Sequence, residues 1–192
     1  MSGSRNRWWL LIIVCVVVVA VFYFLYVRPI PPPQGDGTFQ DLSGWAGPIR
    51  DRGYHVKFPE FDLSLPFQSE YRISGLQNVG DRCGLYLVLV DAKGDWPWER
   101  DHRHVGGRLT LRLLKSNGEV VINVSGPLGA FIWWGFKDKH ALYQKDDRSH
   151  FYPDPRLEYM VKIDYRPAPE LHGMRGYVYL NTGAKYSGSR YR

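Results

Sequence analysis

A loop rich in tryptophan, histidine and charged residues offers the most chemistry in the sequence. The segment from Asp95 to Gly107 reads DWPWERDHRHVGG and joins two predicted strands. Trp96 and Trp98 flank Pro97, which restrains the backbone, so both rings can present flat apolar faces to a sugar, a peptide or a lipid headgroup. The alternative is that they fold back over the core, because tryptophan is mostly buried. Long loops often hold sites, so we predict that Trp96 and Trp98 bind a ligand or partner.

The same loop contains two histidines with one residue between them. In an extended chain His102 and His104 would face the same side, with Asp95, Glu99 and Asp101 as conceivable third ligands for a metal ion. A histidine pair without a third ligand at a fitting spacing is typical of solvated surface. We therefore predict no metal site, and assign His102 and His104 to partner binding, where a pH-sensitive contact is equally compatible.

A second aromatic cluster follows in the segment AFIWWGF, residues 130–136. Strand alternation would place Phe131 and Trp133 on one face, and Ile132 and Trp134 on the other. One face must belong to the core. The other is a binding surface, a contact between protomers or a surface covered by a loop. We predict that Trp134 contacts a partner and that Tyr143 lies at the rim of that surface.

The sequence carries no recognisable catalytic motif. It has no Gly-x-Ser-x-Gly elbow, no His-Glu-x-x-His, no phosphate-binding glycine loop and no dinucleotide fingerprint. Pairs of carboxylates such as Asp91 and Glu99 would suit glycosidic hydrolysis, but any domain with this many acids offers such pairs. We predict a protein that is not an enzyme, with no catalytic residues and no cofactor. A glycan-active hydrolase remains an alternative, because sites can be assembled from distant loops.

An apolar segment near the N-terminus predicts a membrane anchor. Residues 8–27, WWLLIIVCVVVVAVFYFLYV, contain no charge, and at about 1.5 Å per residue they match a hydrocarbon core of about 30 Å. A soluble buried helix and a cleaved signal peptide are the alternatives, and cleavage after Ala20 would leave an apolar mature N-terminus. We predict an uncleaved signal anchor. Arg5 and Arg7 in the leader 1–7 favour a cytoplasmic N-terminus and an exported domain at a cell membrane, in a bacterial periplasm.

Charge and cysteine content exclude two further classes of protein. The chain has 25 basic and 19 acidic residues, but six of the basic ones flank the anchor or lie in the tail 185–192. The globular part is therefore nearly neutral, and we predict no nucleic-acid partner. Cys15 lies in the predicted anchor and Cys83 in the exported domain, so no intramolecular disulfide is available.

The rest of the chain predicts one all-β domain. Residues 28–37 are a linker in which prolines favour an extended chain and Gln34–Gly37 favours flexibility. Residues 38–184 form the exported domain, and 185–192 form a basic flexible tail. Period-two alternation between turn residues predicts eight strands: 54–58, 71–74, 85–90, 108–115, 119–125, 130–136, 158–165 and 177–180. Asn117-Gly118 predicts a tight hairpin turn.

Eight antiparallel strands predict a two-sheet sandwich of immunoglobulin-like or jelly-roll type. We expect its core to contain the following apolar residues: Leu85, Leu87, Leu89, Leu111, Val121, Val161, Ile163, Val178 and Leu180. The sequence thus predicts a membrane-anchored binding module that recognises a protein or an envelope glycan, as an accessory subunit of an envelope assembly. The alternative is an inhibitor of immunity type that neutralises a toxin at the membrane.

Overall fold

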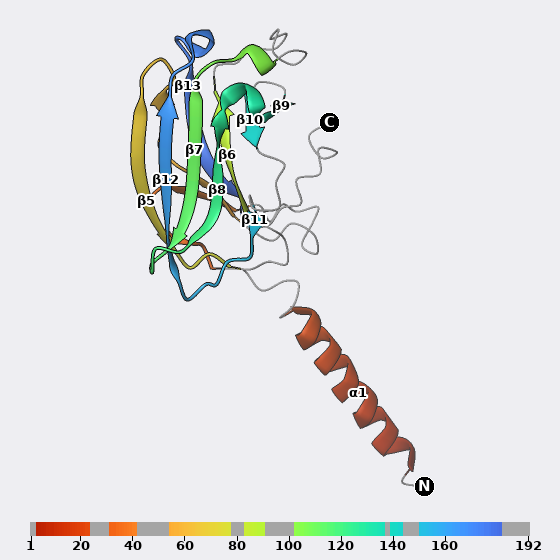
Figure 1. Cartoon of the computed structure of the whole chain (residues 1–192). Coiled ribbons are helices and arrows are strands. Elements are labelled where there is room, and N and C mark those ends of the chain that lie inside the picture. The colour runs from red at the N-terminus through yellow and green to blue at the C-terminus, as the bar shows by residue number, and fades with distance from the viewer. Residues whose placement is uncertain are drawn as a thin grey trace.

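The computed structural model of the chain describes residues 3–23, 31–41, 54–77, 83–90, 102–136, 139–143 and 150–181 (Figure 1). These residues form one N-terminal helix, followed by a series of antiparallel strands in two sheets. The predicted antiparallel two-sheet architecture is therefore confirmed. The short 3-10 helices η2 (His102–His104), η3 (Leu128–Ala130) and η5 (Pro169–Leu171) connect strands.

The helix α1 (Gly3–Phe22) shares no described side-chain packing with the sheets. All its described side chains, from residue 8 onward, are exposed. Residues 24–27 of the predicted membrane span lie outside the described residues. Within the part of the chain that the structure describes, no helix combines the length and the apolar character needed to cross a membrane. The predicted span of residues 8–27 is therefore not confirmed by the described helix.

The smaller sheet has five strands in the order β1-β5-β12-β7-β8. Its strands are β1 (Gln34–Gly35), β5 (Phe67–Ser74), β12 (Glu158–Arg166), β7 (Arg108–Lys115) and β8 (Val120–Pro127). The central strand β12 pairs with β5 over residues 158–165 and with β7 over residues 159–166. We name the two ends of this sheet by their residues. The hairpin end holds Lys115 and Ser74, and the arginine end holds Arg108 and Arg166.

The larger sheet has eight strands, six of them in the order β2-β3-β13-β6-β10-β9. They are β2 (Thr38–Asp41), β3 (Tyr54–Lys57), β13 (Arg175–Asn181), β6 (Cys83–Leu89), β10 (Lys139–Tyr143) and β9 (Ile132–Phe136). Two short strands complete it: β4 (Phe61–Asp62) beside β13, and β11 (His150–Phe151) beside β6. All eight predicted strands overlap observed ones, whereas β1, β2, β4, β10 and β11 were not predicted.

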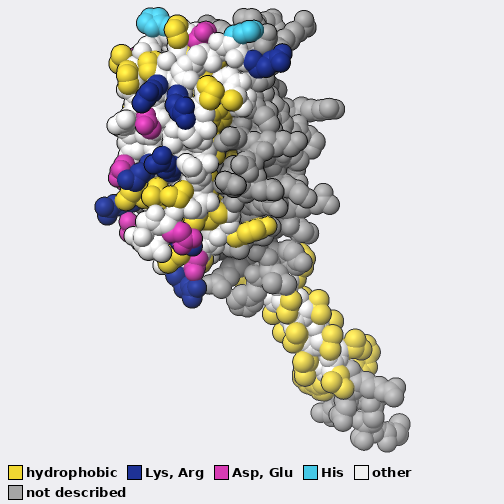
Figure 2. All heavy atoms as spheres, in the orientation of Figure 1, with side chains coloured by type: hydrophobic (Ala, Val, Ile, Leu, Met, Phe, Trp, Pro, Cys, Tyr) yellow, Lys and Arg dark blue, Asp and Glu magenta, His cyan; other side chains and the backbone are white. Residues whose placement is uncertain are grey.

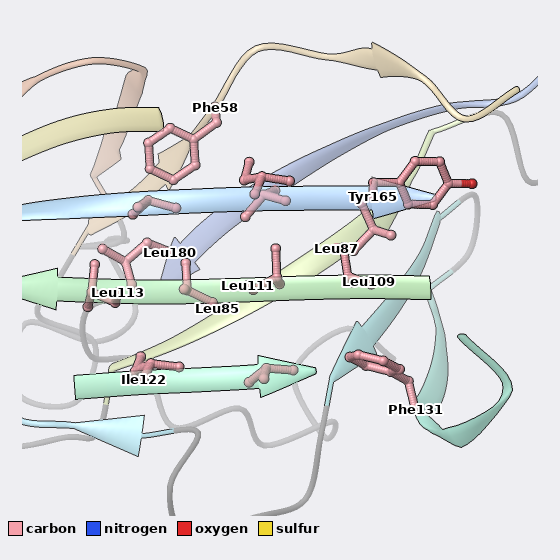
Figure 3. Close-up of a cluster of buried hydrophobic side chains, with 14 of the residues drawn as sticks. Phe58, Leu85, Leu87, Leu109, Leu111, Leu113, Ile122, Phe131, Tyr165 and Leu180 are labelled. Carbon is pink, nitrogen blue, oxygen red and sulfur yellow. The ribbon is translucent and has the colours of Figure 1, made fainter. Parts of the chain in front are cut away.

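The two sheets share one hydrophobic core. Leu109, Leu111 and Leu113 of β7 belong to the same buried cluster as Leu85 and Leu87 of β6, as Figure 3 shows. All the predicted core residues are buried except Val121, which is only partly buried. Strand β6 is buried along its entire length, because Tyr86 and Val88 on its other face are also covered. Its unbroken apolar sequence is explained by burial on both faces.

The core prediction for Val121 is wrong because Ile122 and Val124 take the inward positions of β8. Leu113 pairs with Ile122, but Leu114 pairs with Val120, so Val121 is the extra residue in β8. This β-bulge leaves both Val120 and Val121 outside the core, and from Val121 onward outward and buried residues alternate along β8. Ile122 and Val124 therefore occupy the core, and Val121 packs at its margin.

The hairpin between β7 and β8 forms where the sequence predicts a turn. The Gly118 N–H donates to the Lys115 carbonyl at 2.9 Å, and Gly118 has φ +85°. The turn therefore spans residues 115–118, with Gly118 in the left-handed conformation that glycine adopts without strain. Across the turn, Lys115 Nζ lies 2.8 Å from Glu119 Oε1.

The segment Gln34–Gly37, for which the glycines predict flexibility, is held between the two sheets. Residues 34–35 pair with β5, and Thr38 begins the pairing of β2 with β3. Between them, the Asp36 N–H donates to the Arg72 carbonyl, and the Arg72 N–H donates to Asp36 Oδ2, both at 2.8 Å. We call this segment the Asp36 clip. It places the chain that leads to α1 at the hairpin end of the five-stranded sheet.

A buried tyrosine joins β12 to the loop before β5. Tyr165 is fully buried, and its hydroxyl donates to the Leu63 carbonyl at 2.9 Å. Burial raises the pKa of Tyr165 to about 12. Folded protein therefore holds this proton more tightly than the unfolded chain. The resulting stabilisation is complete below the unfolded pKa near 10, and is lost as the pH rises from about 10 to about 12.

We expect the substitution Tyr165→Phe to lower the free energy of unfolding by about 1 kcal/mol, because it leaves the Leu63 carbonyl without its donor. Urea unfolding at neutral pH measures this loss. The matched control is Tyr152→Phe, since Tyr152 is 59% exposed and its hydroxyl can bond to water. Equal unfolding midpoints for the two variants would contradict the assignment.

Candidate functional site

The structure describes only part of the predicted partner-binding set. Trp96 and Trp98 lie outside the described residues. Trp134 lies in β9 opposite Ala141 of β10, and Tyr143 lies two residues beyond Ala141. The register thus brings the strand positions of Trp134 and Tyr143 close together, as one binding surface would require. Their side chains are outside the described set, so their assignment to a partner stays a prediction.

The two histidines do not have the geometry that the sequence suggested. Residues 102–104 form the 3-10 helix η2 instead of an extended segment. At three residues per turn, positions two apart are rotated by about 120° around a 3-10 helix, unlike the same-side placement that an extended chain would give. His104 is exposed. Among the described residues, no group of three His, Cys, Asp or Glu side chains is arranged to hold a metal ion.

The loop that follows η2 is fixed to the arginine end by close backbone contacts. The Gly106 N–H donates to Glu170 Oε2 at 3.3 Å, and the Gly129 N–H donates to the Val105 carbonyl at 3.2 Å. Gly107 has φ +73°, and a Cβ atom there would lie 2.6 Å from the Arg166 carbonyl oxygen. The main chain at Gly107 therefore lies against the end of β12. This contact fixes the backbone position of Arg108, the next residue.

The outer face of the five-stranded sheet presents a polar surface built by three strands. On β7 the outward residues are Arg108, Thr110 and Arg112, which alternate with the buried leucines. Beside them on β12 and β5, a shallow depression of about 210 Å³ is lined by Gln68, Ser69, Glu70, Thr110, Arg112, Lys162, Ile163 and Asp164. Figure 2 shows this face with basic and acidic side chains interspersed. We call it the outer face.

The charges of the outer face are incompletely paired. Lys162 Nζ lies 2.5 Å from Glu70 Oε1, and Thr110 shares a hydrogen bond of 2.9 Å with Ser125. Among the described residues, Arg108 contacts the Ser125 hydroxyl, at 3.4 Å. Within the described part of the chain, Arg112, Arg166 and Asp164 form no ion pair or hydrogen bond through their side chains.

Two of these arginines oppose each other directly. Arg108 of β7 is the register partner of Arg166 on β12, which places their Cα atoms about 5 Å apart. Both side chains are exposed. Like charges at opposed positions of a sheet destabilise the pairing. An anionic group placed between the two guanidinium groups would remove that repulsion.

Sequence reasoning missed the outer face as a site. The alternation of RLTLRLLK shows that Arg108, Thr110 and Arg112 share one side of a strand. The pairing of Arg108 with Arg166 depends on the neighbouring positions of β7 and β12, and these strands are far apart in the sequence. No local pattern indicates that adjacency.

Comparison with protein-family models, with curated proteins and with solved structures finds no match for this chain.

Proposed function

We propose that the protein is a membrane-tethered recognition module, in which the two sheets form a β-sandwich that binds a protein partner on the extracytoplasmic side. The observation that carries the tether is the uncovered apolar surface of α1. Its large apolar side chains from Trp8 to Val21 are 49–68% exposed. Such a surface is unfavourable in water at about 25 cal/mol per Å², so it requires an apolar environment. The proposed anchor is the whole segment 8–27, which extends beyond the described helix.

The Asp36 clip supports a defined orientation of the sandwich on this tether. It fixes the incoming chain at the hairpin end, and only six residues, 28–33, separate the proposed anchor from β1. Six extended residues reach at most about 20 Å. The hairpin end then lies near the bilayer, while the eight-residue strand β7 places the arginine end about 24 Å further away. The outer face would thus stand roughly upright beside the membrane, within reach of a neighbouring protein.

A protein partner is favoured by the mixed charge of the outer face. Glu70 and Asp164 lie among the basic residues, and they would weaken the binding of a uniformly anionic polymer relative to a surface of mixed charge. A protein surface can present discrete charges of both signs in a complementary arrangement.

Arg5 and Arg7 beside the proposed anchor favour a cytoplasmic N-terminus, which would export the sandwich.

Alkaline carbonate extraction of membranes tests the tether. We expect the full-length protein to stay in the membrane pellet, and the double variant Val14→Arg/Val17→Arg to move largely to the supernatant. Each central arginine costs about 2.5–3.5 kcal/mol of insertion free energy. The matched control is Val120→Arg, at a valine that is 49% exposed on the folded domain. Retention of the double variant in the pellet would contradict the proposed anchor.

A further inference from the structure

We propose that the outer face binds an acidic protein surface, whose carboxylates are received by Arg108, Arg166 and Arg112. This inference rests on the proposed recognition function and adds the chemistry of the partner. Arginine presents its N–H donors in a planar fork that matches both oxygens of a carboxylate. Arg112 and Arg166 form no side-chain hydrogen bond or ion pair in the described part of the chain, and Arg108 has only a long contact with Ser125.

The position of the arginine pair is held by the fold. Gly107 lies so close to the Arg166 carbonyl that only glycine fits there without displacement of the main chain. The pairing of β12 with β7 then sets Arg108 opposite Arg166. The two guanidinium groups are therefore attached to a rigid strand pair, although they repel each other. A carboxylate between them would turn an unfavourable pair into two charge-assisted contacts.

The spacing along β7 defines what the partner presents. Arg108 and Arg112 lie on the same side of the strand, four residues apart, which corresponds to about 14 Å. Asp164 is unpaired in the described part of the chain. It lies two residues before Arg166 on the same side of β12, and it opposes Thr110. The partner surface therefore carries carboxylates separated by about this distance. A less acidic patch of the partner would face Asp164.

Fluorescence anisotropy of a labelled peptide of alternating glutamate and serine tests this chemistry with the full-length protein in zwitterionic detergent micelles. The peptide offers carboxylates at every second residue, so it includes the required spacing. We expect binding at an ionic strength of about 0.01 M that weakens strongly at about 0.15 M, where the Debye length falls from about 30 Å to about 8 Å. The same peptide with glutamine in place of glutamate should not bind.

Three variants are expected to change the affinity for the peptide, and a fourth serves as a control. Arg108→Gln/Arg166→Gln should weaken peptide binding about tenfold or more, since it removes the paired donors. Arg108→Lys/Arg166→Lys should weaken binding less, because lysine keeps the positive charge. It should still weaken binding, because lysine lacks the planar pair of N–H donors of the guanidinium group. Asp164→Asn should tighten binding, because it removes a repelling carboxylate. Arg72→Gln is the control, at a side chain 71% exposed that pairs with Glu158 at the hairpin end.

Three outcomes of the peptide measurements would overturn the inference: no binding of the acidic peptide to the wild-type protein, equal binding by the Arg108→Gln/Arg166→Gln and Arg72→Gln variants, or weaker binding by Asp164→Asn. Tighter binding of a single-stranded oligonucleotide than of the peptide would also overturn it, because that result would indicate general attraction of polyanions. Unfolding midpoints of each variant establish that the fold is intact. Carbonate extraction measures membrane attachment independently of peptide binding. A failure of the protein to bind the acidic peptide is therefore distinguishable from a failure of the proposed anchor.

Discussion

Replacement of Leu111 by alanine is expected to lower the free energy of unfolding by about 3 kcal/mol. Leu111 is fully buried at the centre of β7, in the core that both sheets share (Figure 3). Removing three carbon atoms from such a site costs the transfer free energy of those atoms and leaves a cavity, which together amount to about 2–5 kcal/mol. Urea unfolding followed by far-ultraviolet circular dichroism gives the value.

The control for Leu111→Ala is Leu65→Ala, at a leucine that is 60% exposed between β4 and β5. This change should alter the free energy of unfolding by no more than about 0.5 kcal/mol. Because the two sheets share one core, Leu111→Ala should weaken amide hydrogen-exchange protection in β6 as well as in β7. Loss of protection confined to the five-stranded sheet would show that the sheets do not unfold together.

Replacement of Gly35 by alanine is expected to destabilise the fold by about 3 kcal/mol and to release the Asp36 clip. Gly35 has φ +122°, and a Cβ atom there would lie 2.2 Å from the Arg72 carbonyl oxygen. Both the backbone conformation and the contact are unfavourable for alanine, and a strained backbone alone costs about 1–3 kcal/mol. The Arg72 amide, which donates to Asp36 Oδ2, should exchange its hydrogen faster in the variant.

The matched control for Gly35→Ala is Gly118→Ala. Gly118 also has a positive φ, +85°, but no atom lies within 4 Å of the Cβ position. Its substitution should therefore cost only the backbone strain, about 1 kcal/mol. Equal destabilisation by the two substitutions would mean that the close approach of Gly35 to β5 is not maintained in solution.

The strands that the sequence predicts best are those that bury one face. In β7, leucines alternate with polar residues, and each leucine that the pattern places inward is buried. The missed strands β1, β2, β4, β10 and β11 have only two to five residues. So short a strand shows no clear period, and it forms because a neighbouring strand offers free hydrogen-bonding groups.

Other errors arise where long-range contacts override a local pattern. The bulge at Val121 depends on how β8 pairs with Leu113 and Leu114, and no local pattern indicates it. Gly35 and Gly37 suggested a flexible linker, yet their positive φ angles let the chain pass closely along β5 and β3. The arginine pair needed the adjacency of β7 and β12, which only the tertiary fold supplies.

Site-specific photocrosslinking from Thr110 in native membranes tests the recognition function most directly. Thr110 lies on the outer face between Arg108 and Arg112, so a photoreactive residue there would touch any bound partner. We expect one protein adduct that decreases strongly in the Arg108→Gln/Arg166→Gln background and does not form from Asn117 in the hairpin turn. No protein adduct from Thr110, or an adduct of equal yield without the two arginines, would contradict it.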